Sequence, residues 1–290
     1  MDVLKELKPE KEFFIGIDSD GCVFDSMEIK QKECFCPNFI KSFGLQSVQK
    51  YARETWEFVN LYSKFRGVNR FVAIVEAFRL LNDRPEVHAR GMILPDTSPL
   101  EEWISQETRL GNPGLEEYIG KKAEPFLNTV LDWSYSVNAS VAEMVQGLTP
   151  YPAVLKSLKI MREKADTLVV SQTPLEALKK EWKENGIDTR VRFIAGQEHG
   201  TKTEHIAMAA KGKYPDSKIL MIGDAPGDYE AARLNGVLFY PIIPGLEEAS
   251  WINFLDDALS RFFEGSYAGE YEKKLINEFH RYLPEKPSWE

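Results

Sequence analysis

The sequence has few of the residues that disulfide frameworks and zinc sites require. It holds three cysteines, Cys22, Cys34 and Cys36, and four histidines in 290 residues. An odd number of clustered cysteines does not describe a disulfide framework. Cys34 and Cys36 could supply two soft metal ligands, but no histidine lies close to them in the sequence. Buried cysteines in a reducing compartment are therefore the favoured interpretation.

Two further absences exclude classes of function. No segment reaches the roughly 18 consecutive apolar residues of a membrane span, and residues 1–13 are charged and lack the apolar stretch of a signal peptide. We therefore expect a cytoplasmic protein with no membrane partner. The formal net charge is −9 and there is no Lys/Arg-rich run. A nucleic-acid partner is not expected, because binding a phosphate backbone requires a basic surface.

The most informative stretch is Phe13–Asp25, with the sequence FFIGIDSDGCVFD. Its nearly continuous apolar start is typical of a strand that is buried on both faces of a parallel sheet. Asp18, Asp20 and Asp25 follow, and carboxylates at the end of a buried strand are costly unless a cation or a shared proton compensates them. Gly21 would let the backbone approach a ligand closely. The alternative is an ordinary surface turn, since Asp and Gly are common in turns.

The chain alternates between strand and helix patterns except in one long segment. This alternation is typical of βαβ units in a parallel sheet, so we predict an α/β fold. From Ser26 to about Gly147 there is no buried strand pattern, and helical periodicity predicts an all-helical insert. The expected strands are Phe13–Ile17, Thr167–Val170, Val191–Ala195, Lys218–Ile222 and Val237–Pro241.

Distinctive polar residues follow the expected strands. They are Asp18 and Asp20, Ser171, the segment Gly200–Lys202, and the segment Gly223–Asp228. The carboxyl ends of parallel strands share one edge of a sheet, so these groups can converge. Asp18 and Asp224 can supply hard oxygen ligands to Mg²⁺, and Asp228 could hold a metal-bound water. Ser171 can donate a hydrogen bond to a phosphate oxygen, and Lys202 adds positive charge near a helix N-terminus.

These four motifs, in this order, resemble those of the haloacid dehalogenase superfamily, in its Mg²⁺-dependent phosphatase branch. The resemblance covers the whole α/β part, and the helical insert matches the type 1 cap of members like β-phosphoglucomutase and phosphoglycolate phosphatase. It implies a Rossmann-like parallel sheet with helices on both faces, plus an inserted all-α cap domain. On this basis residues 1–25 and 148–290 form the core domain, and residues 26–147 form the cap.

The resemblance also implies a reaction, which is hydrolysis of a small phosphorylated metabolite, a phosphomonoester, through an aspartyl-phosphate. Asp18 would be the nucleophile and Asp20 the general acid and base. Dehalogenases of the superfamily generally lack an acid at the position of Asp20, so its presence favours oxygen-phosphate chemistry. The implied phosphate-binding residues are Gly21, Ser171, Gln172 and Lys202, and the implied Mg²⁺ ligands are Asp18, the backbone carbonyl of Asp20, Asp224 and Asp228.

One stretch of the insert, Lys64–Arg70, resembles the basic, glycine-containing substrate loop of β-phosphoglucomutase-like members. Arg66, Gly67 and Arg70 are therefore candidate substrate contacts, and a solvated helix start is the alternative. Two other functions stay open, namely a phosphomutase that uses this loop to bind a second phosphate, and a non-catalytic metabolite-binding protein. The sequence does not define the substrate or whether the protein is a monomer or a homodimer.

Overall fold

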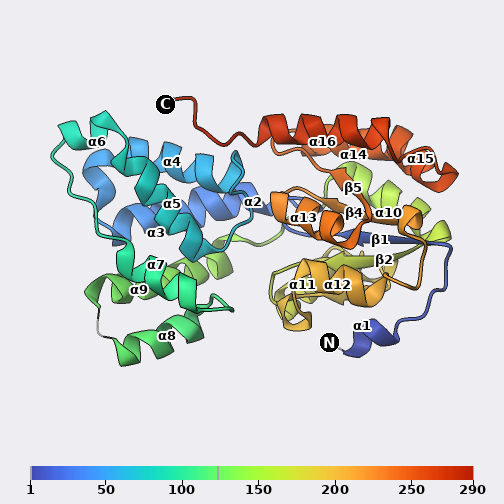
Figure 1. The fold of residues 1–290 in the computed structure, drawn as a ribbon, viewed down its shortest axis with the longest axis horizontal. Coiled ribbons are helices and arrows are strands. Elements are labelled where there is room, and N and C mark those ends of the chain that lie inside the picture. The colour runs from blue at the N-terminus through green and yellow to red at the C-terminus, as the bar shows by residue number, and fades with distance from the viewer. Residues whose placement is uncertain (1, 123, 290) are drawn as a thin grey trace. The chain divides into compact units, whose positions relative to one another are not determined.

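The computed structural model describes residues 2–122 and 124–289, which form two compact units (Figure 1). We call Met1–Ser26 with Leu148–Pro284 the core unit, and Met27–Gly147 with Glu285–Glu290 the helical unit. Two details differ from the domain limits expected from the sequence. The first boundary falls one residue later, and the segment after Pro284, which was assigned to the α/β part, groups with the helical unit.

The core unit contains a five-stranded sheet in the order β3-β2-β1-β4-β5, and all four strand pairs are parallel. The predicted α/β fold class is therefore confirmed. The strands are β1 (Phe13–Ile17), β2 (Ala165–Val170), β3 (Phe193–Ala195), β4 (Ile219–Gly223) and β5 (Leu238–Pro241). Each lies where a strand was expected, because short apolar runs that are buried on both faces leave a strong signal.

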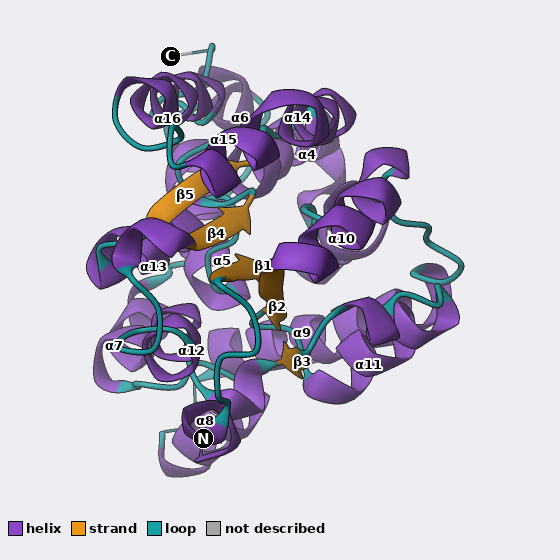
Figure 2. Ribbon diagram, turned by 90° about the vertical axis from the view of Figure 1, so that its right-hand side faces the viewer, coloured by secondary structure: helices purple, strands orange, loops and turns teal. Residues whose placement is uncertain are grey.

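Helices cover both faces of this sheet (Figure 2). The side chains of β1 alternate between two apolar clusters, as a strand requires. Phe13, Ile15 and Ile17 belong to one cluster, which includes residues of 152–164 and 175–184, and Phe14 belongs to the other, which includes residues of 202–209 and 226–235. The helices of the core unit are α1 (Asp2–Glu6), α10 (Pro152–Lys164), α11 (Leu175–Glu184), α12 (Lys202–Ala209), α13 (Pro226–Asn235), α14 (Glu247–Asn253), α15 (Leu259–Glu264) and α16 (Glu270–Tyr282), with a π-helical turn at Phe254–Ala258.

The helical unit is built around an aromatic cluster. Trp56 packs against Phe39 with ring centroids 4.7 Å apart and against Trp133 at 5.7 Å. Its helices are α3 (Cys36–Ser42), α4 (Gln49–Leu61), α5 (Arg70–Asn82), α6 (Pro85–Ala89), α7 (Ser98–Gln106), α8 (Asn112–Lys121) and α9 (Pro125–Met144), and α2 (Ser26–Ile29) enters it through a π-helical segment, Lys30–Phe35. α6 begins at Pro85, a residue that is compatible with the first turn of a helix.

None of the described helices has both the length and the apolar character needed to cross a membrane.

Candidate active site

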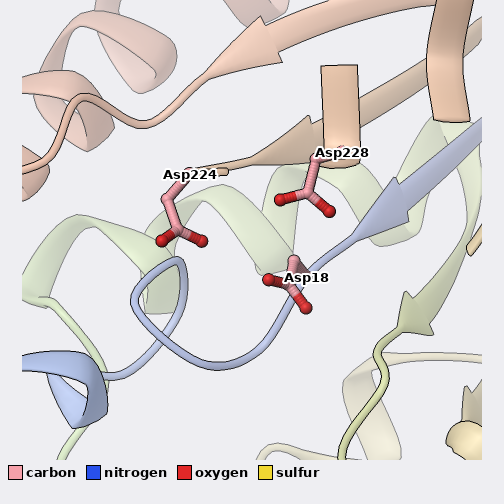
Figure 3. Close-up of side chains that lie close together, drawn as sticks. All are labelled: Asp18, Asp224 and Asp228. Carbon is pink, nitrogen blue, oxygen red and sulfur yellow. The ribbon is translucent and has the colours of Figure 1, made fainter. Parts of the chain in front are cut away.

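The candidate site lies where the order of the strands reverses. From β1 the chain proceeds to β2 and β3 on one side, and then to β4 and β5 on the other. Ligands of open α/β sheets bind at the carboxyl ends of the strands beside such a switch point. Asp18 directly follows β1, Asp224 directly follows β4, and Asp228 lies in the first turn of α13. Figure 3 shows the three carboxylates directed toward one another.

The turn after β1 is fixed by its own backbone and by the core. The carbonyl of Ser19 accepts hydrogen bonds from the amides of Val23 (2.9 Å) and Phe24 (3.2 Å). The hydroxyl of Ser19 accepts one from the indole of Trp182 at 2.9 Å, which holds this side chain toward the core. Gly21 adopts a φ of 72°, a left-handed conformation that favours glycine. Residues 19–24 therefore form a tight turn that directly follows Asp18 and contains Asp20.

One lysine links two of the three carboxylates. Lys202 Nζ lies 3.0 Å from an oxygen of Asp18 and 2.6 Å from an oxygen of Asp228. Asp18, Asp224 and Asp228 each offer an oxygen within 4.8 Å of the others, and all three residues are buried. Several carboxylate oxygens converging on one point are the donor set that Mg²⁺ prefers. The residues present therefore fit a divalent cation.

Burial changes the titration of this group. It raises the pKa of Asp18 from 3.8 to about 6, because desolvation outweighs the attraction of Lys202, and the charge of Asp228 adds to the effect. Burial also raises the pKa of Asp228. Desolvation opposes the charge on Lys202, but Asp18 and Asp228 overcome it and raise its pKa. Lys202 is therefore charged at neutral pH, and a cation would favour the ionised form of Asp18.

Local sequence explains how Lys202 and Asp228 are held. Lys202 is the first residue of α12, whose N-cap Thr201 forms a capping box with Glu204. Asp228 accepts a hydrogen bond from the amide of Ala225 at 3.1 Å. A Cβ atom on Gly223 would lie 2.3 Å from the carboxyl carbon of Asp228, so only glycine fits beside it. This steric requirement depends on tertiary packing and could not be predicted from the sequence.

The second acid, Asp20, is held by two hydroxyl groups. The Ser26 hydroxyl donates to Asp20 Oδ1, and the Thr173 hydroxyl donates to Asp20 Oδ2 at 2.7 Å. Thr173 lies in the loop after β2, so it comes from a different strand end. Sequence reasoning missed both residues, although Thr173 stands only two positions after the expected phosphate-binding serine.

Two expected phosphate contacts lie at the end of β2. Ser171 is buried and its amide donates to the carbonyl of Ala195 at 3.0 Å, while its hydroxyl accepts a bond from the Thr173 amide at 3.2 Å. The side-chain amide of Gln172 donates to the carbonyl of Gly200 at 2.9 Å. The Gln172 side chain therefore connects the loops after β2 and β3.

Comparison with known proteins gives matches at the level of structure alone. No protein-family profile matches the chain, and no curated protein matches its sequence. A hydrolase of the haloacid dehalogenase-like family from Streptococcus pneumoniae matches with a TM-score of 0.51 over 84% of this chain and 91% of its own, at 15% identity. A protein provisionally named a phosphoglycolate phosphatase, from Lactobacillus delbrueckii subsp. bulgaricus, matches with a TM-score of 0.51 over 89% of this chain and 100% of its own, at 16% identity.

The chain has the fold of haloacid dehalogenase-like hydrolases. The fold that the sequence motifs implied is thus confirmed. In this haloacid dehalogenase-like fold, the strand ends bring together Asp18, Lys202, Asp224 and Asp228.

The candidate substrate residues of the helical unit make contacts inside that unit. Arg66 is 2% exposed and donates from Nη1 to the carbonyl of Leu61 at 3.0 Å. Arg70 donates from Nη1 to the Ser134 hydroxyl at 3.0 Å and to Asn138 Oδ1 at 2.7 Å. Burial lowers the pKa of Arg70 to about 10. Gly67, between the two arginines, adopts a left-handed φ of 77°.

The three cysteines and His205 are buried, and burial determines their protonation states. Cys22, Cys34 and Cys36 are buried free thiols, and burial raises the pKa of each. Reactive cysteines need a lowered pKa, so these three are inert packing residues. Burial, with smaller effects from His199 and Lys202, lowers the pKa of His205 to about 4, so this histidine is neutral.

Proposed function

We propose that this chain is a Mg²⁺-dependent phosphatase that hydrolyses a small phosphorylated metabolite through an aspartyl-phosphate. The observation that carries the proposal is the convergence of Asp18, Asp224 and Asp228 on one point, with Lys202 in contact with two of them. A binding protein has no need for a lysine-paired, buried carboxylate with a second acid, Asp20, two residues away.

The proposed metal ligands are the carboxylates of Asp18, Asp224 and Asp228 and the backbone carbonyl of Asp20. Bound Mg²⁺ would neutralise the negative charge that a carboxylate and a phosphate bring to the same place. Lys202 supplies a second positive charge beside Asp18, at 3.0 Å. Ser171, the Gln172 amide and the amides near Gly21 are proposed to donate hydrogen bonds to the phosphate oxygens, as P-loop-like backbone turns do for other phosphates.

The proposed reaction has two displacements at phosphorus. In the first, an oxygen of Asp18 forms a bond to phosphorus, the ester P–O bond breaks, and the leaving oxygen takes the proton of Asp20. In the second, the Asp20 carboxylate takes a proton from water, whose oxygen bonds to phosphorus while the bond to Asp18 breaks. Inorganic phosphate leaves, and both aspartates return to their starting protonation states.

Specificity for the rest of the substrate is proposed to lie in the helical unit, where Arg66, Gly67 and Arg70 remain the candidates. Nothing in the described residues favours the phosphomutase alternative. A mutase would interconvert isomers without net phosphate release, so one assay separates the two functions.

The test is phosphate release from a panel of phosphorylated metabolites, with Mg²⁺ and with EDTA. We expect release that requires Mg²⁺ and that disappears in Asp18→Asn, while Asp188→Asn, a change at a partly exposed acid of the core unit, retains it. Phosphate release by Asp18→Asn at the wild-type rate would show that Asp18 is not the nucleophile. Ligand-induced thermal stabilisation without any turnover would favour a binding protein instead.

A further inference from the structure

The carboxylate of Asp20 is oriented by the loop after β2. Its Oδ2 accepts the Thr173 hydroxyl at 2.7 Å, across 153 positions of sequence, and its Oδ1 accepts the Ser26 hydroxyl. A carboxylate that accepts a directional hydrogen bond on each oxygen has its plane fixed. A general acid must point one oxygen at the leaving group, so orientation of this plane affects its efficiency.

Thr173 is itself held in place by the loop after β3. Its amide donates to the Ser171 hydroxyl at 3.2 Å, and its carbonyl accepts the amide of Gln197 at 3.2 Å. The backbones of the two loops touch at Gly196, where a Cβ atom would lie 2.8 Å from the Thr173 carbonyl oxygen. Threonine is branched at Cβ, which restricts its side-chain rotamers further.

The residues on either side of Thr173 are fixed by the same loop. The Leu175 amide donates to Glu198 Oε2 at 3.0 Å, and the Gln172 side chain donates to the Gly200 carbonyl at 2.9 Å. The segment Gly196–Gly200 thus forms hydrogen bonds with the loop after β2 at Thr173 and on both sides of it. None of the roles proposed above uses Glu198 or Gln197, so these contacts have no explanation in the chemistry of the phosphate itself.

We infer that Thr173 is a positioning residue for the general acid, held in register by the segment Gly196–Gly200. The inference rests on the proposed function, because it assigns a partner to Asp20 in that reaction. Thr173 donates one hydrogen bond that sets the direction of the Asp20 carboxyl group, and Glu198 acts one step further away by fixing the start of α11.

The variant Thr173→Val tests this inference, because valine keeps the shape of threonine and removes the hydroxyl. The readout is kcat for two substrates, p-nitrophenyl phosphate, whose leaving group needs little protonation, and an alkyl phosphate, whose leaving group needs a proton. We expect a loss of about 10- to 100-fold on the alkyl phosphate and a several-fold loss on the aryl phosphate, since general acids contribute about 10²–10⁴-fold. Thr173→Ser should restore most of the activity on the alkyl phosphate.

Two further variants complete the design. Glu198→Ala should show the same preference for the aryl substrate with a smaller loss, and it keeps the test open if Thr173→Val does not fold. Thr189→Val, at an exposed threonine of the core unit, should leave both rates unchanged. A merely structural role for Thr173 predicts equal losses on the two substrates, and that result in Thr173→Val and Glu198→Ala would overturn the inference.

The outcome separates this inference from the proposed function. If the wild-type chain releases no phosphate from any substrate, or if Asp20→Asn shows no dependence on the leaving group, the proposed function is wrong and the inference falls with it. If wild type and Asp20→Asn behave as proposed while Thr173→Val matches wild type on both substrates, the inference alone is wrong.

Discussion

Both units bury positive side chains, but the groups that contact Lys202 in the core unit differ from those that contact Arg70 in the helical unit. In the core unit, Lys202 contacts the carboxylates of Asp18 and Asp228. In the helical unit, Arg70 donates to Ser134 and Asn138. A charge held by neutral groups fixes a structure, whereas buried charges of both signs respond to protons, metal ions and anions. The contrast predicts that the core cluster carries out the reaction and that the contacts of Arg70 stabilise the helical unit.

Removing Lys202 should produce the largest effect and tests the chemical half of this contrast. Lys202→Met is expected to lower kcat/KM for phosphate release by about 10²–10³-fold, the usual cost of losing one electrostatic contact to a reacting oxygen. The measurement is steady-state kinetics at saturating Mg²⁺. Lys211→Met, a change to a lysine that pairs with Asp216 away from the acid cluster, is the control. A Lys202→Met enzyme within threefold of wild type would contradict the proposed role.

Two glycines of the same motif should differ in their tolerance of a methyl group. Gly223→Ala places a Cβ atom 2.3 Å from the Asp228 carboxyl carbon, whereas a Cβ on Gly227 meets no atom within 4 Å. We expect Gly223→Ala to cost about 1–3 kcal/mol of unfolding free energy through overpacking and to weaken Mg²⁺ binding.

Gly227→Ala is the matched control. Since Gly227 lies in α13, alanine there should be neutral or stabilise by up to about 1 kcal/mol. Urea unfolding and calorimetric titration with Mg²⁺ give the two quantities. Equal metal affinity in the two variants would mean that the position of Asp228 does not matter for the metal.

These two glycines also illustrate which features of the site can be predicted from the sequence. The strands and the acids that follow them could be predicted, because an apolar run and its polar end are adjacent in the chain. The close approach of Gly223 to Asp228, and the bond from Thr173 to Asp20, depend on how separate segments pack. Such contacts leave no pattern of periodicity or spacing in the sequence. The sequence therefore predicts the acids and the lysine of the candidate site, but not the residues that position them.

The helical unit illustrates the same limit. Its helices could be predicted from their periodicity, but the direction of the arginine side chains could not. A basic stretch such as Lys64–Arg70 has the same composition whether it faces a ligand or its own helices. The structure adds the partners of Arg70, which are Ser134 and Asn138.

Replacing Arg70 tests the structural half of the contrast. Arg70→Met should reduce the unfolding free energy by about 1–3 kcal/mol, because it leaves partly buried acceptors without a donor. Arg79→Met on the same helix is the control, since the Arg79 side chain is 54% exposed where it pairs with Glu76 and Asp83. Ion pairs of such exposed side chains contribute at most about 1 kcal/mol. If Arg70→Met is as stable as Arg79→Met but raises KM, Arg70 contacts substrate and the contrast fails.

The increase in Tm that Mg²⁺ causes should differ by a few degrees between pH 5 and pH 7, because the proposed ligand Asp18 titrates in this range. The folded-state pKa of Asp18 is raised from 3.8 to about 6. Without metal, the folded state therefore binds more protons than the unfolded state, and the contribution of Asp18 to stability is present below about pH 4 and lost as the pH rises toward 6. Mg²⁺ binds the ionised form, so it should raise Tm more at pH 7 than at pH 5. Equal shifts at both values, or a shift that persists in Asp18→Asn, would exclude Asp18 as a ligand.

The smallest expected effect concerns the segment after α16, which the sequence did not connect to the helical unit. The Trp289 ring centre lies 3.9 Å from the guanidinium carbon of Arg84 and 5.5 Å from the ring centre of Phe58. Arg84 is 3% exposed and also donates to Glu54 at 2.7 Å. Trp289 therefore covers a cation that belongs to the helical unit.

Trp289→Ala should cost about 1 kcal/mol, because one cation–π contact and one edge-to-face aromatic contact are lost from a ring that is 37% exposed. Trp289→Phe should recover part of this loss. Hydrogen exchange locates the effect. Amides of α4, which contains Glu54, and of α6, which begins directly after Arg84, should exchange faster in Trp289→Ala. Amides of β1 and β4 should keep their exchange rates. Faster exchange in the strands instead would mean that this segment stabilises the core unit, as the sequence alone had suggested.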